Sequence, residues 1–396
     1  MLTGKHILLG ITGGIAAYKS ASLASMLAKL HADVHVIMTK NAEQMISPTV
    51  FEALTGNKVI DDVFDRDSGY QVAHIAMAHE ADLVMIAPAS ANMIAKLAHG
   101  VADDMLSTTM LAVTAPVYIV PAMNTKMYEH AATQANMQTL KSYGYHVVEP
   151  ASGYLACGDT GKGKMPEPEE LLEYILYEAA CEKDMVGKKV LITAGPTQEA
   201  IDPVRYITNH STGKMGYALA KIAAARGAQV VLVTGPTNLR APLFSTVLPV
   251  TTAQQMYETV DAHFDDQDIV VMSAAVADYR PVHTESEKMK KKEASSVLEL
   301  ERTKDILGSM SAKRTNQFLC GFSMETEHML ENSRAKLEKK NLDMIVANNL
   351  RMEGAGFGTD TNIVSIITKD DVYELPQMSK EEVAGVIFDR ILERLS

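Results

Sequence analysis

The stretch KHILLGITGG at residues 5–14 and the stretch KKVLITAGPT at residues 188–197 decide the fold class of this chain. Each is an apolar run of strand length that leads into a turn containing glycine. A buried strand followed by such a turn and a helix is a typical opening of a doubly wound α/β sheet. We therefore predict two such units, one in each half of the chain.

Further strand-like runs alternate with helix-length segments in both halves, which predicts mainly parallel sheets covered by helices. In the first half these runs span 33–38, 82–87, 117–121 and 146–148, and in the second half 229–234, 268–274, 317–322, 343–347 and 362–368. The segment EELLEYILYEAACEKD at 169–184 is typical of a helix that closes a domain. We place the domain boundary after it, giving domains 1–185 and 186–396.

Length and composition indicate a globular enzyme that acts on small molecules. A chain of 396 residues exceeds what one hydrophobic core usually supports, and its 47% hydrophobic and 22% charged residues are typical of folded domains. A formal net charge of −12 disfavours nucleic acid as a partner. The amino-terminal apolar run is only strand-sized, so we expect neither a signal peptide nor a membrane span, and we expect a cytoplasmic protein.

Cysteine usage suggests neither a disulfide framework nor a zinc site of the usual spacing. The three cysteines, Cys157, Cys181 and Cys320, are far apart in sequence and form no CxxC pair. An important cysteine would therefore act as a thiol.

Three motifs in the first half come directly after strand-like runs. They are GITGGIAAYK at 10–19, PASANMIAK at 88–96 and PAMN at 121–124. Ligands of open α/β sheets bind at the carboxyl ends of the strands, and free N–H groups at a glycine turn before a helix suit a phosphate. Glycines at such a turn also serve tight turning alone, so the first motif by itself leaves both interpretations open.

Together with HIAMAHEADL at 74–83 and LACGDTGKG at 155–163, these motifs resemble the flavoprotein family of cysteine decarboxylases. The resemblance is closest to the bacterial bifunctional phosphopantothenoylcysteine decarboxylase and phosphopantothenate–cysteine ligase family, and it spans nearly the whole chain. It implies a flavodoxin-like first domain that binds FMN and decarboxylates 4′-phosphopantothenoylcysteine to 4′-phosphopantetheine. The matching catalytic positions are His74, Asn124 and Cys157.

The resemblance also implies a role for each of these side chains. FMN oxidises the substrate thiol to a thioaldehyde, which accepts the electrons that decarboxylation releases. His74 is the implied base, the neutral amide of Asn124 orients the substrate carboxylate, and Cys157 donates a proton as hydride returns to the enethiolate. The glycines near Cys157 suit a lid, and the FMN contacts implied are Gly13, Ile15, Thr39, Ser90 and Asn92.

The second half carries TAGPTQEAIDPVRYITNHSTGKMG at 193–216, which is dense in turn formers and hydrogen-bonding side chains. It is not a Walker A loop, because GPTQEAID lacks the glycine–lysine ending. Asn209, Ser211 and Thr212 before two glycines would place donors at a helix start, which suits a phosphate or acyl phosphate. Helix capping alone also explains Ser211 and Thr212.

This stretch resembles the phosphopantothenate–cysteine ligase signature, which implies a Rossmann-like second domain. Such a ligase activates 4′-phosphopantothenate with CTP as an acyl-cytidylate, releases pyrophosphate and joins the acyl group to cysteine. The resemblance implies that Asn209 serves the intermediate and its conversion and that Lys288 neutralises charge during nucleotide transfer. The implied CTP contacts are Met272, Ser273, Ala274, Asp278, Lys288, Lys304, Asp305, Ile306, Leu307, Phe322, Lys336 and Lys340.

The match to the family is imperfect in one motif, and the sequence does not reveal the metal ligands. Lys304, Asp305 and Ile306 stand where the family often has Pro-Asp-Ile. Triphosphate chemistry implies Mg²⁺, but the sequence shows no protein cage for it, and Asp278 serves either the metal or base recognition. The lysine-rich stretch 279–298 has little periodicity and is predicted to be a long functional loop.

Other classes are less consistent with the residues. A nicotinamide dehydrogenase would need GxGxxG followed by an acidic residue, and this pattern is missing. Related flavoproteins act in prenyl transfer or as regulatory subunits, but the set of His74, Asn124 and Cys157 favours decarboxylation. An inert scaffold would leave two whole site signatures unexplained. The resemblance further implies a homo-oligomer, with trimeric contacts of the flavin domain and dimeric contacts of the ligase domain.

Overall fold

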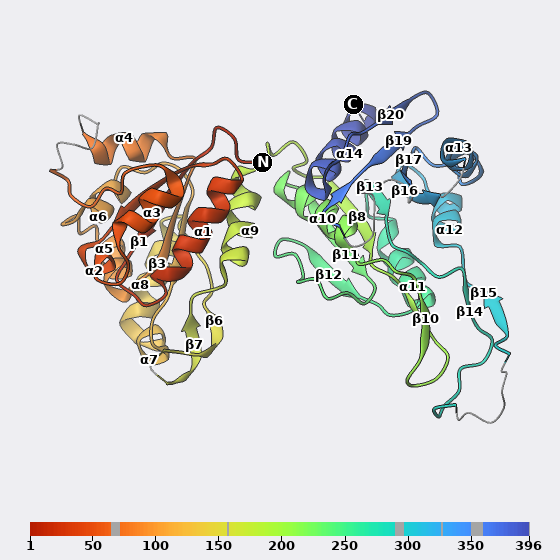
Figure 1. The fold of residues 1–396 in the computed structure, drawn as a ribbon, viewed down its shortest axis with the longest axis horizontal. Coiled ribbons are helices and arrows are strands. Elements are labelled where there is room, and N and C mark those ends of the chain that lie inside the picture. The colour runs from red at the N-terminus through yellow and green to blue at the C-terminus, as the bar shows by residue number, and fades with distance from the viewer. Residues whose placement is uncertain (65–71, 157, 290–296, 326–327, 350–358, 396) are drawn as a thin grey trace. The chain divides into compact units, whose positions relative to one another are not determined.

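The computed structural model describes residues 1–64, 72–156, 158–289, 297–325, 328–349 and 359–395 (Figure 1). The chain divides into two compact units, Met1–Cys181 and Glu182–Ser396. Each unit has its own sheet and its own hydrophobic core. No helix in the described part of the chain is long and apolar enough to cross a membrane.

The described residues of the first unit build a five-stranded parallel sheet in the order β2-β1-β3-β4-β5. This is the strand order of flavodoxin-like folds, in which the chain changes direction between β1 and β3. The predicted fold class is confirmed. The strands are β1 (His6–Ile11), β2 (Asp33–Met38), β3 (Leu83–Ala89), β4 (Val117–Pro121) and β5 (His146–Val147).

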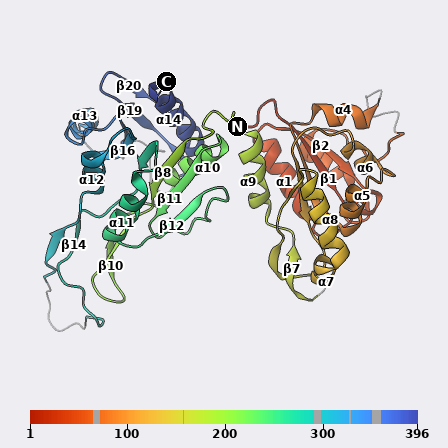
Figure 2. The same cartoon turned by 180° about the vertical axis from the view of Figure 1, so that it is seen from behind.

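Helices cover both faces of this sheet, so the strands are apolar on both sides. Along β1, Ile7, Leu9 and Ile11 pack into one core, and Leu8 packs into the other. Burial on both faces explains why these strands are continuous apolar runs in the sequence. One face carries α1 (Ala17–Lys29), α3 (Pro48–Thr55) and α9 (Pro168–Ala179) (Figure 1). The other carries α4 (Ala73–Glu80), α5 (Ala91–His99), α6 (Met105–Met110) and α8 (Ala131–Ser142) (Figure 2).

Short elements complete the carboxyl end of this sheet. The helices α2 (Lys40–Glu43) and α7 (Thr125–Glu129) follow β2 and β4. An antiparallel pair, β6 (Ala151–Tyr154) and β7 (Thr160–Lys164), flanks the glycine-rich segment that the sequence predicts to be a lid. The predicted lid therefore includes a hairpin.

The described residues of the second unit build an eight-stranded sheet in the order β12-β11-β8-β13-β16-β17-β19-β20. The first six strands are parallel, and the chain changes direction between β8 and β13, as in Rossmann-like folds. The parallel strands are β8 (Lys189–Ala194), β11 (Gln229–Thr234), β12 (Thr246–Pro249), β13 (Ile269–Met272), β16 (Phe318–Glu325) and β17 (Met344–Asn349).

The last predicted strand of this unit, 362–368, was wrong as a single run. It is divided into β18 (Thr361–Asn362), which pairs with β21 (Met378–Ser379), and β19 (Val364–Ile367). β19 runs antiparallel to β17 and continues into β20 (Val372–Glu374). Parallel pairing needs a crossover, usually a helix, and the described residues between β17 and β19 contain none.

Helices again cover both faces of the second sheet. One face carries α10 (Lys214–Ala225) and α14 (Lys380–Leu395), and the other carries α11 (Ala253–Phe264), α12 (Ile306–Lys313) and α13 (Met329–Lys339) (Figure 2). Two hairpins extend from the carboxyl edge: β9 (Gln198–Ala200) with β10 (Tyr206–Thr208), and β14 (Tyr279–Pro281) with β15 (Leu300–Arg302). The predicted long loop 279–298 therefore begins inside a strand.

Close packing of α10 on β8 depends on Gly216. A Cβ at this position would lie 2.5 Å from Ala194 Cβ and 2.8 Å from Ser273 Oγ. We expect Gly216→Ala to destabilise the ligase domain by about 1–3 kcal/mol, because the added methyl forces α10 away from the sheet. Thermal unfolding of the full chain measures this effect.

Gly385 provides a matched control, because it is also a helical glycine and a Cβ there would meet nothing within 4 Å. Gly385→Ala should leave stability unchanged or raise it by up to about 1 kcal/mol through helix propensity. Equal effects of the two alanines would contradict the close-packing explanation.

A buried arginine joins the start of the second unit to two helices. Arg226, 7% exposed at the end of α10, donates to Asp184 Oδ1 at 2.8 Å and to Asp389 Oδ1 of α14 at 2.6 Å. The hydrogen bond from Arg226, against some burial, lowers the pKa of Asp184 from its ordinary value of 3.8. The contribution of Asp184 to stability is therefore fully present above pH 3.8 and is lost as the pH falls through the lowered pKa.

We expect Asp184→Asn to lower the melting temperature at pH 7 by about 2–4 °C, since an ion pair whose carboxylate is partly exposed contributes up to about 1 kcal/mol. The difference from the wild type should shrink below pH 3.8. Melting curves recorded at intervals of about one pH unit, from about pH 2.5 to about pH 7, test this prediction. Asp370→Asn, in the exposed turn after β19, is the control, and an equal loss there would refute the assignment.

Candidate active sites

The first site lies where the chain changes direction between β1 and β3. Thr12 Oγ1, just after β1, donates to Pro88 O at 2.7 Å and accepts from Ser90 N at 2.8 Å. Ser20 Oγ of α1 donates to Ala87 O. These bonds fix the two strand ends beside the start of α5, where Ser90 caps the helix by accepting from Met93 N at 3.3 Å.

A cavity of about 390 Å³ opens at this point, and it is named the flavin-side cavity because the residues predicted to contact FMN gather there. Its size is within the roughly 300–1,000 Å³ of small-ligand pockets. Its walls are the glycine turn with the first turn of α1, the start of α5, residues 122–124 and 127, the hairpin β6–β7 and Met165. Three of its large apolar side chains are open to solvent: Ile15 is 65% exposed, Tyr18 61% and Tyr154 73%. Such an exposed apolar lining is typical of a ligand site.

Glycines allow the backbone to close around this cavity. A Cβ on Gly13 would lie 2.6 Å from Asn41 Cβ, so no side chain fits between the turn and the start of α2. Gly163 has φ +133°, and its Cβ would lie 2.2 Å from Met123 O. A Cβ on Gly161 would lie 2.6 Å from Thr125 Oγ1. The glycines of the hairpin therefore let β7 lie directly against the residues around Asn124.

Asn124 is held at the start of α7 with its amide between two partners. Its Oδ1 accepts from Lys126 N at 2.9 Å, which caps the helix, and its Nδ2 donates to Asp159 Oδ2 at 2.6 Å. Asp159 lies in the turn that joins β6 to β7, and its carbonyl oxygen accepts from Leu155 N at 2.8 Å. The amide thus joins the PAMN motif to the lid hairpin.

A buried lysine that the sequence did not single out supports the same hairpin. Lys19 of α1 is 5% exposed, and its Nζ donates to Met165 O and to Glu167 Oε1, both at 2.9 Å. The hydrogen bond from Lys19, opposed by slight burial, lowers the pKa of Glu167. Lysine is rarely buried without a partner, but the partners here lie about 146 positions away in sequence, so no local pattern indicated them.

The structure brings together four of the eight residues predicted for this site. Gly13, Ile15, Ser90 and Asn124 line the cavity. Thr39 instead caps α2, and Asn92 is exposed on α5 outside the lining. His74 lies on α4, does not line the cavity and has a buried Nδ1 without a hydrogen-bond partner among the described residues. Cys157 lies outside the described residues, although Leu155 and Ala156 next to it line the cavity.

The second site lies where the chain changes direction between β8 and β13. Ser273 Oγ donates to Thr193 O at 2.6 Å, and Thr193 Oγ1 accepts from Ala274 N at 3.1 Å. Asn209 Nδ2 donates to Ala275 O at 3.0 Å and to Val276 O at 3.3 Å. These bonds hold the segment 273–276 across the carboxyl ends of both strands.

Two neighbouring cavities flank this segment and share Ala274, Val276, Asp278, Phe322 and Lys336. The nucleotide-side cavity has a volume of about 470 Å³ and lies at the start of α12. Its other walls are Thr193, Met272, Tyr279, Arg302, Thr303, Lys304, Asp305, Ile306, Leu307 and Lys340. The helix-side cavity has a volume of about 410 Å³ and lies at the start of α10, from Asn209 to Gly216, with Ser273, Ser323, Met324, Asn348, Asn362 and Lys380.

The charged side chains of the nucleotide-side cavity are paired in place. Asp305 caps α12 by accepting from Gly308 N at 3.0 Å and forms an ion pair with Lys340. Burial raises the pKa of the Asp305 carboxyl, but the bonds from Lys340 and Gly308 outweigh it, so the pKa is lowered. Lys304 Nζ lies 3.5 Å from the centre of the Tyr257 ring. Lys304, which stands where the family often has proline, is therefore stabilised by the aromatic ring of Tyr257, a residue outside the 304–307 motif.

Most residues predicted for the nucleotide line one cavity or the other. Met272, Ala274, Asp278, Lys304, Asp305, Ile306, Leu307, Phe322, Lys336 and Lys340 line the nucleotide-side cavity, and Asn209 and Ser273 line the helix-side cavity. Lys288 lines neither, because its exposed segment runs beside the β9–β10 turn, where Met289 N donates to Asp202 Oδ2 at 3.2 Å. Lys290, Lys291 and Lys292 lie outside the described residues.

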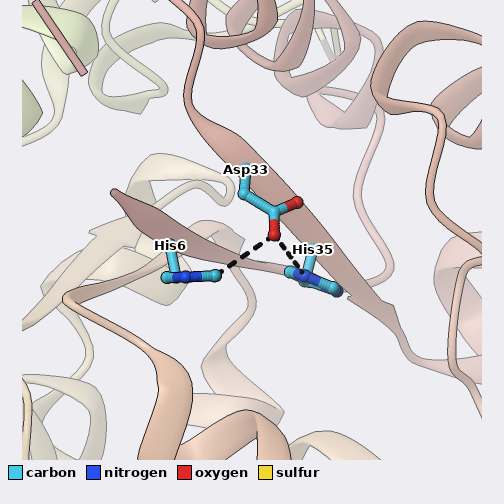
Figure 3. A group of neighbouring side chains, drawn as sticks. All are labelled: His6, Asp33 and His35. Atoms are coloured by element: carbon cyan, nitrogen blue, oxygen red, sulfur yellow. Dashed lines mark ion pairs between the residues drawn. The ribbon is translucent and has the colours of Figure 1, made fainter. Parts of the chain in front are cut away.

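One group of three metal-ligand side chains occurs among the described residues, and it belongs to neither site. Asp33 Oδ2 lies 3.1 Å from His6 Nδ1 and 3.3 Å from His35 Nε2, and the three ligand atoms lie within 4.8 Å of one another (Figure 3). The group is at the amino end of β1 and β2, opposite the flavin-side cavity. Imidazole nitrogens suit zinc or nickel, whereas Mg²⁺ prefers oxygen, so this group does not supply the predicted magnesium site.

Two family models match the chain, and together they define its class. The model described as Flavoprotein matches residues 1–179. The model described as DNA/pantothenate metabolism flavoprotein C-terminal domain matches residues 185–395. The molecule is therefore a flavoprotein domain followed by a pantothenate-metabolism domain.

Curated relatives extend the match over the whole chain. The coenzyme A biosynthesis bifunctional protein CoaBC of Bacillus subtilis (strain 168) is 48% identical over 395 residues, covering 99% of this chain and 97% of that protein. The protein of the same name from Vibrio cholerae is 45% identical over 402 residues, covering 100% and 99%. A crystal structure of the C-terminal domain of such a protein is 45% identical, covers 54% of this chain and 98% of that chain, and has a TM-score of 0.47.

The chain belongs to the family of bifunctional coenzyme A biosynthesis proteins. It is a bifunctional enzyme with phosphopantothenoylcysteine decarboxylase and phosphopantothenate–cysteine ligase activities. The predicted family and pair of activities are confirmed.

Proposed function

We propose that the two sites catalyse consecutive steps, with the ligase site acting first. The nucleotide-side and helix-side cavities together would bind CTP and 4′-phosphopantothenate. The flavin-side cavity would bind FMN and the 4′-phosphopantothenoylcysteine formed. The observation that carries this proposal is the gathering of ten predicted nucleotide residues, from four separate stretches of sequence, around one cavity.

The lining of the flavin-side cavity supports FMN as its ligand. The bare backbone at Gly13 and Gly14, with the start of α5 at Ser90, offers N–H donors to a phosphate. The apolar faces of Ile15, Tyr18 and Tyr154 suit a flat ring system. When bound, FMN supplies the oxidation of the substrate thiol to a thioaldehyde and the return of the electrons after CO₂ has left.

The side chains of this chain would orient the substrate and move its protons. Asn124 would hold the substrate carboxylate by hydrogen bonds from its neutral amide, so that no cation stabilises the carboxylate against loss of CO₂. His74 would accept a substrate proton, and Cys157 would return one to the enethiolate. Gly161 and Gly163 would let the hairpin close over the intermediate and exclude water.

In the ligase reaction, an oxygen of the 4′-phosphopantothenate carboxylate would form a bond to the α-phosphorus of CTP. The bond from that phosphorus to the bridging oxygen would break, and its electron pair would leave with pyrophosphate. The amine of cysteine would then attack the acyl carbonyl, releasing CMP and a proton. Asn209 would position the acyl-cytidylate, and Lys304, Lys336 and Lys340 would surround the nucleotide with positive charge.

Two predicted catalytic residues lie outside the three cavities described above, and the carboxylate proposed for the metal borders two of them. His74 and Lys288 line none of these three cavities, which is consistent with action in the site of a neighbouring subunit: a trimer of flavin domains and a dimer of ligase domains. Asp278 is exposed and borders both ligase cavities, so it is the carboxylate best situated to bind a Mg²⁺ held mainly by the phosphates.

The proposal is tested with the purified full chain. Its visible spectrum should show a bound flavin, and 4′-phosphopantothenate, cysteine, Mg²⁺ and CTP should yield pyrophosphate and CO₂. Replacing CTP with ATP tests nucleotide choice, and replacing Mg²⁺ with a chelator tests the metal. Pyrophosphate without CO₂ would leave only the ligase half standing, and a colourless protein releasing neither would refute both assignments.

A further inference from the structure

Three side chains that are able to bind a metal ion meet at the amino end of β1 and β2, outside both sites (Figure 3). Parallel pairing sets His6 of β1 opposite Asp33 of β2. His35 follows Asp33 by two positions, and side chains two apart in a strand point to the same face of the sheet. Strand pairing therefore brings together three ligands whose separation along the chain follows no metal-binding motif.

The separations of the ligand atoms match the geometry of a zinc site. Asp33 Oδ2 lies 3.1 Å from His6 Nδ1 and 3.3 Å from His35 Nε2. Tetrahedral zinc with bonds of about 2.0–2.1 Å holds its ligand atoms about 3.3–3.4 Å apart. The two nitrogens lie within 4.8 Å of each other. Two of the three separations are thus already in place, and the third needs to shorten by at most about 1.5 Å.

One of the three ligand atoms lacks a partner. His6 Nδ1 is enclosed and has no hydrogen-bond partner among the described residues. Its contact with Asp33 Oδ2 is short but lacks the direction of a hydrogen bond. An enclosed polar atom without a partner is costly, and a metal ion bound to this nitrogen would offset the cost.

Neighbouring hydrogen bonds hold two of the ligands in position. Asn57 Nδ2, after α3, donates to Asp33 Oδ1 at 2.7 Å and to Val34 O at 3.0 Å. Oδ2 is thereby left for the two imidazoles. The backbone of His6 is fixed as well, because its N donates to Asp82 Oδ2 at 2.8 Å. Outer hydrogen bonds of this kind orient the ligands of protein metal sites.

We propose that His6 Nδ1, Asp33 Oδ2 and His35 Nε2 bind one Zn²⁺ ion, with water as the fourth ligand. The side chains of His6 and Asp33 are 40% and 43% exposed, which leaves a path for the ion and room for the water. The ion would join β2, at the edge of the described sheet, to β1. It would stabilise the first unit from the end of the sheet opposite the flavin-side cavity and would take no part in either reaction.

The test uses the untagged full chain, freed of metal, with Zn²⁺ alone as the probe in calorimetry. Asp33→Asn keeps an oxygen for Asn57 but removes the carboxylate, and His35→Gln removes one imidazole. We expect the wild type to bind one equivalent of zinc more than either variant, and zinc affinity at this site to fall about 100-fold or more in both. His99→Gln, at the exposed end of α5, is the matched control and should bind zinc like the wild type.

Thermal unfolding gives a second measurement that does not depend on activity. Zinc at about 100 times its Kd should raise the melting temperature of the first unit by about 5 °C in the wild type and in His99→Gln. The rise should be absent in both ligand variants, whose bound flavin shows that they fold.

Cobalt in place of zinc tests the geometry of the site. Co²⁺ should give the visible bands of a four-coordinate ion at wavelengths beyond the flavin absorption, and His35→Gln should lose them. Equal zinc stoichiometry and equal melting shifts in the wild type and both ligand variants would overturn the inference. A wild type that binds no zinc more tightly than the ligand variants would also overturn it and would leave these side chains as an ion pair only.

Discussion

Replacing Asn124 with aspartate is expected to slow decarboxylation of supplied 4′-phosphopantothenoylcysteine by about 100-fold or more, the loss typical of removing one precisely placed donor. The helix cap would survive, because a carboxylate oxygen also accepts from Lys126 N. The donor that lies 2.6 Å from Asp159 Oδ2 would be lost, and two carboxylates would repel each other at this place. A third carboxylate, on the substrate, would then be repelled from the same place.

CO₂ release measures this effect, and flavin absorbance shows that the cofactor site remains intact. Asn136→Asp, the same chemical change in α8 outside the cavity lining, should retain full activity. Pyrophosphate release by the ligase domain should be unchanged in both variants. A decarboxylase that tolerates Asn124→Asp would show that the amide does not contact the substrate.

The second large effect is expected from Asn209→Asp in the ligase site. The amide of Asn209 donates to the carbonyl oxygens of Ala275 and Val276, and an aspartate would set a carboxylate against both. We expect ligase turnover to fall about 100-fold or more, because the segment between the two cavities is displaced and the intermediate loses its positioning. Decarboxylation of supplied 4′-phosphopantothenoylcysteine should not change.

Separate measurement of the two ligase half-reactions makes this result specific. Pyrophosphate release without cysteine reports activation of the carboxylate, and product formation with cysteine reports conversion of the intermediate. Asn238→Asp, in the exposed loop after β11, controls for the added charge. Normal product formation by Asn209→Asp would exclude the assigned role of the amide.

Together the two variants test whether each domain works independently within one chain. Each substitution should slow one activity by about 100-fold or more and spare the other, since the hydrogen bonds described for each amide are to groups of its own unit. A variant that loses both activities would indicate damage to folding, and the melting temperature would show this.

At the flavin-side cavity, the sequence could predict the positions that depend on local backbone geometry. Gly13 and Gly163 stand where a Cβ would clash with a neighbouring segment, and Ser90 and Asn124 cap the helices that follow their strands. Such requirements depend on the residue type and its close neighbours in the chain, so motifs record them. Lys19 was missed because its partners lie at the other end of the domain.

At the ligase site, too, the residues of a local motif were predicted, and residues from distant parts of the chain were missed. Its helix-start motif includes Asn209 and Lys214, but Lys380 and Asn348 were missed because isolated polar residues at strand and helix ends have no local signature. The direction of the last strand was also missed, since an apolar run has the same pattern in parallel and antiparallel pairing.

The sequence by itself determined that this protein has two α/β units of a bifunctional family and which short motifs end their strands, because hydrophobic period and turn chemistry are local properties. Only the tertiary structure decided the strand order, the partners of Lys19, and the absence of His74 and Lys288 from the described cavities. These features depend on pairing and burial between segments many residues apart, which no local pattern specifies.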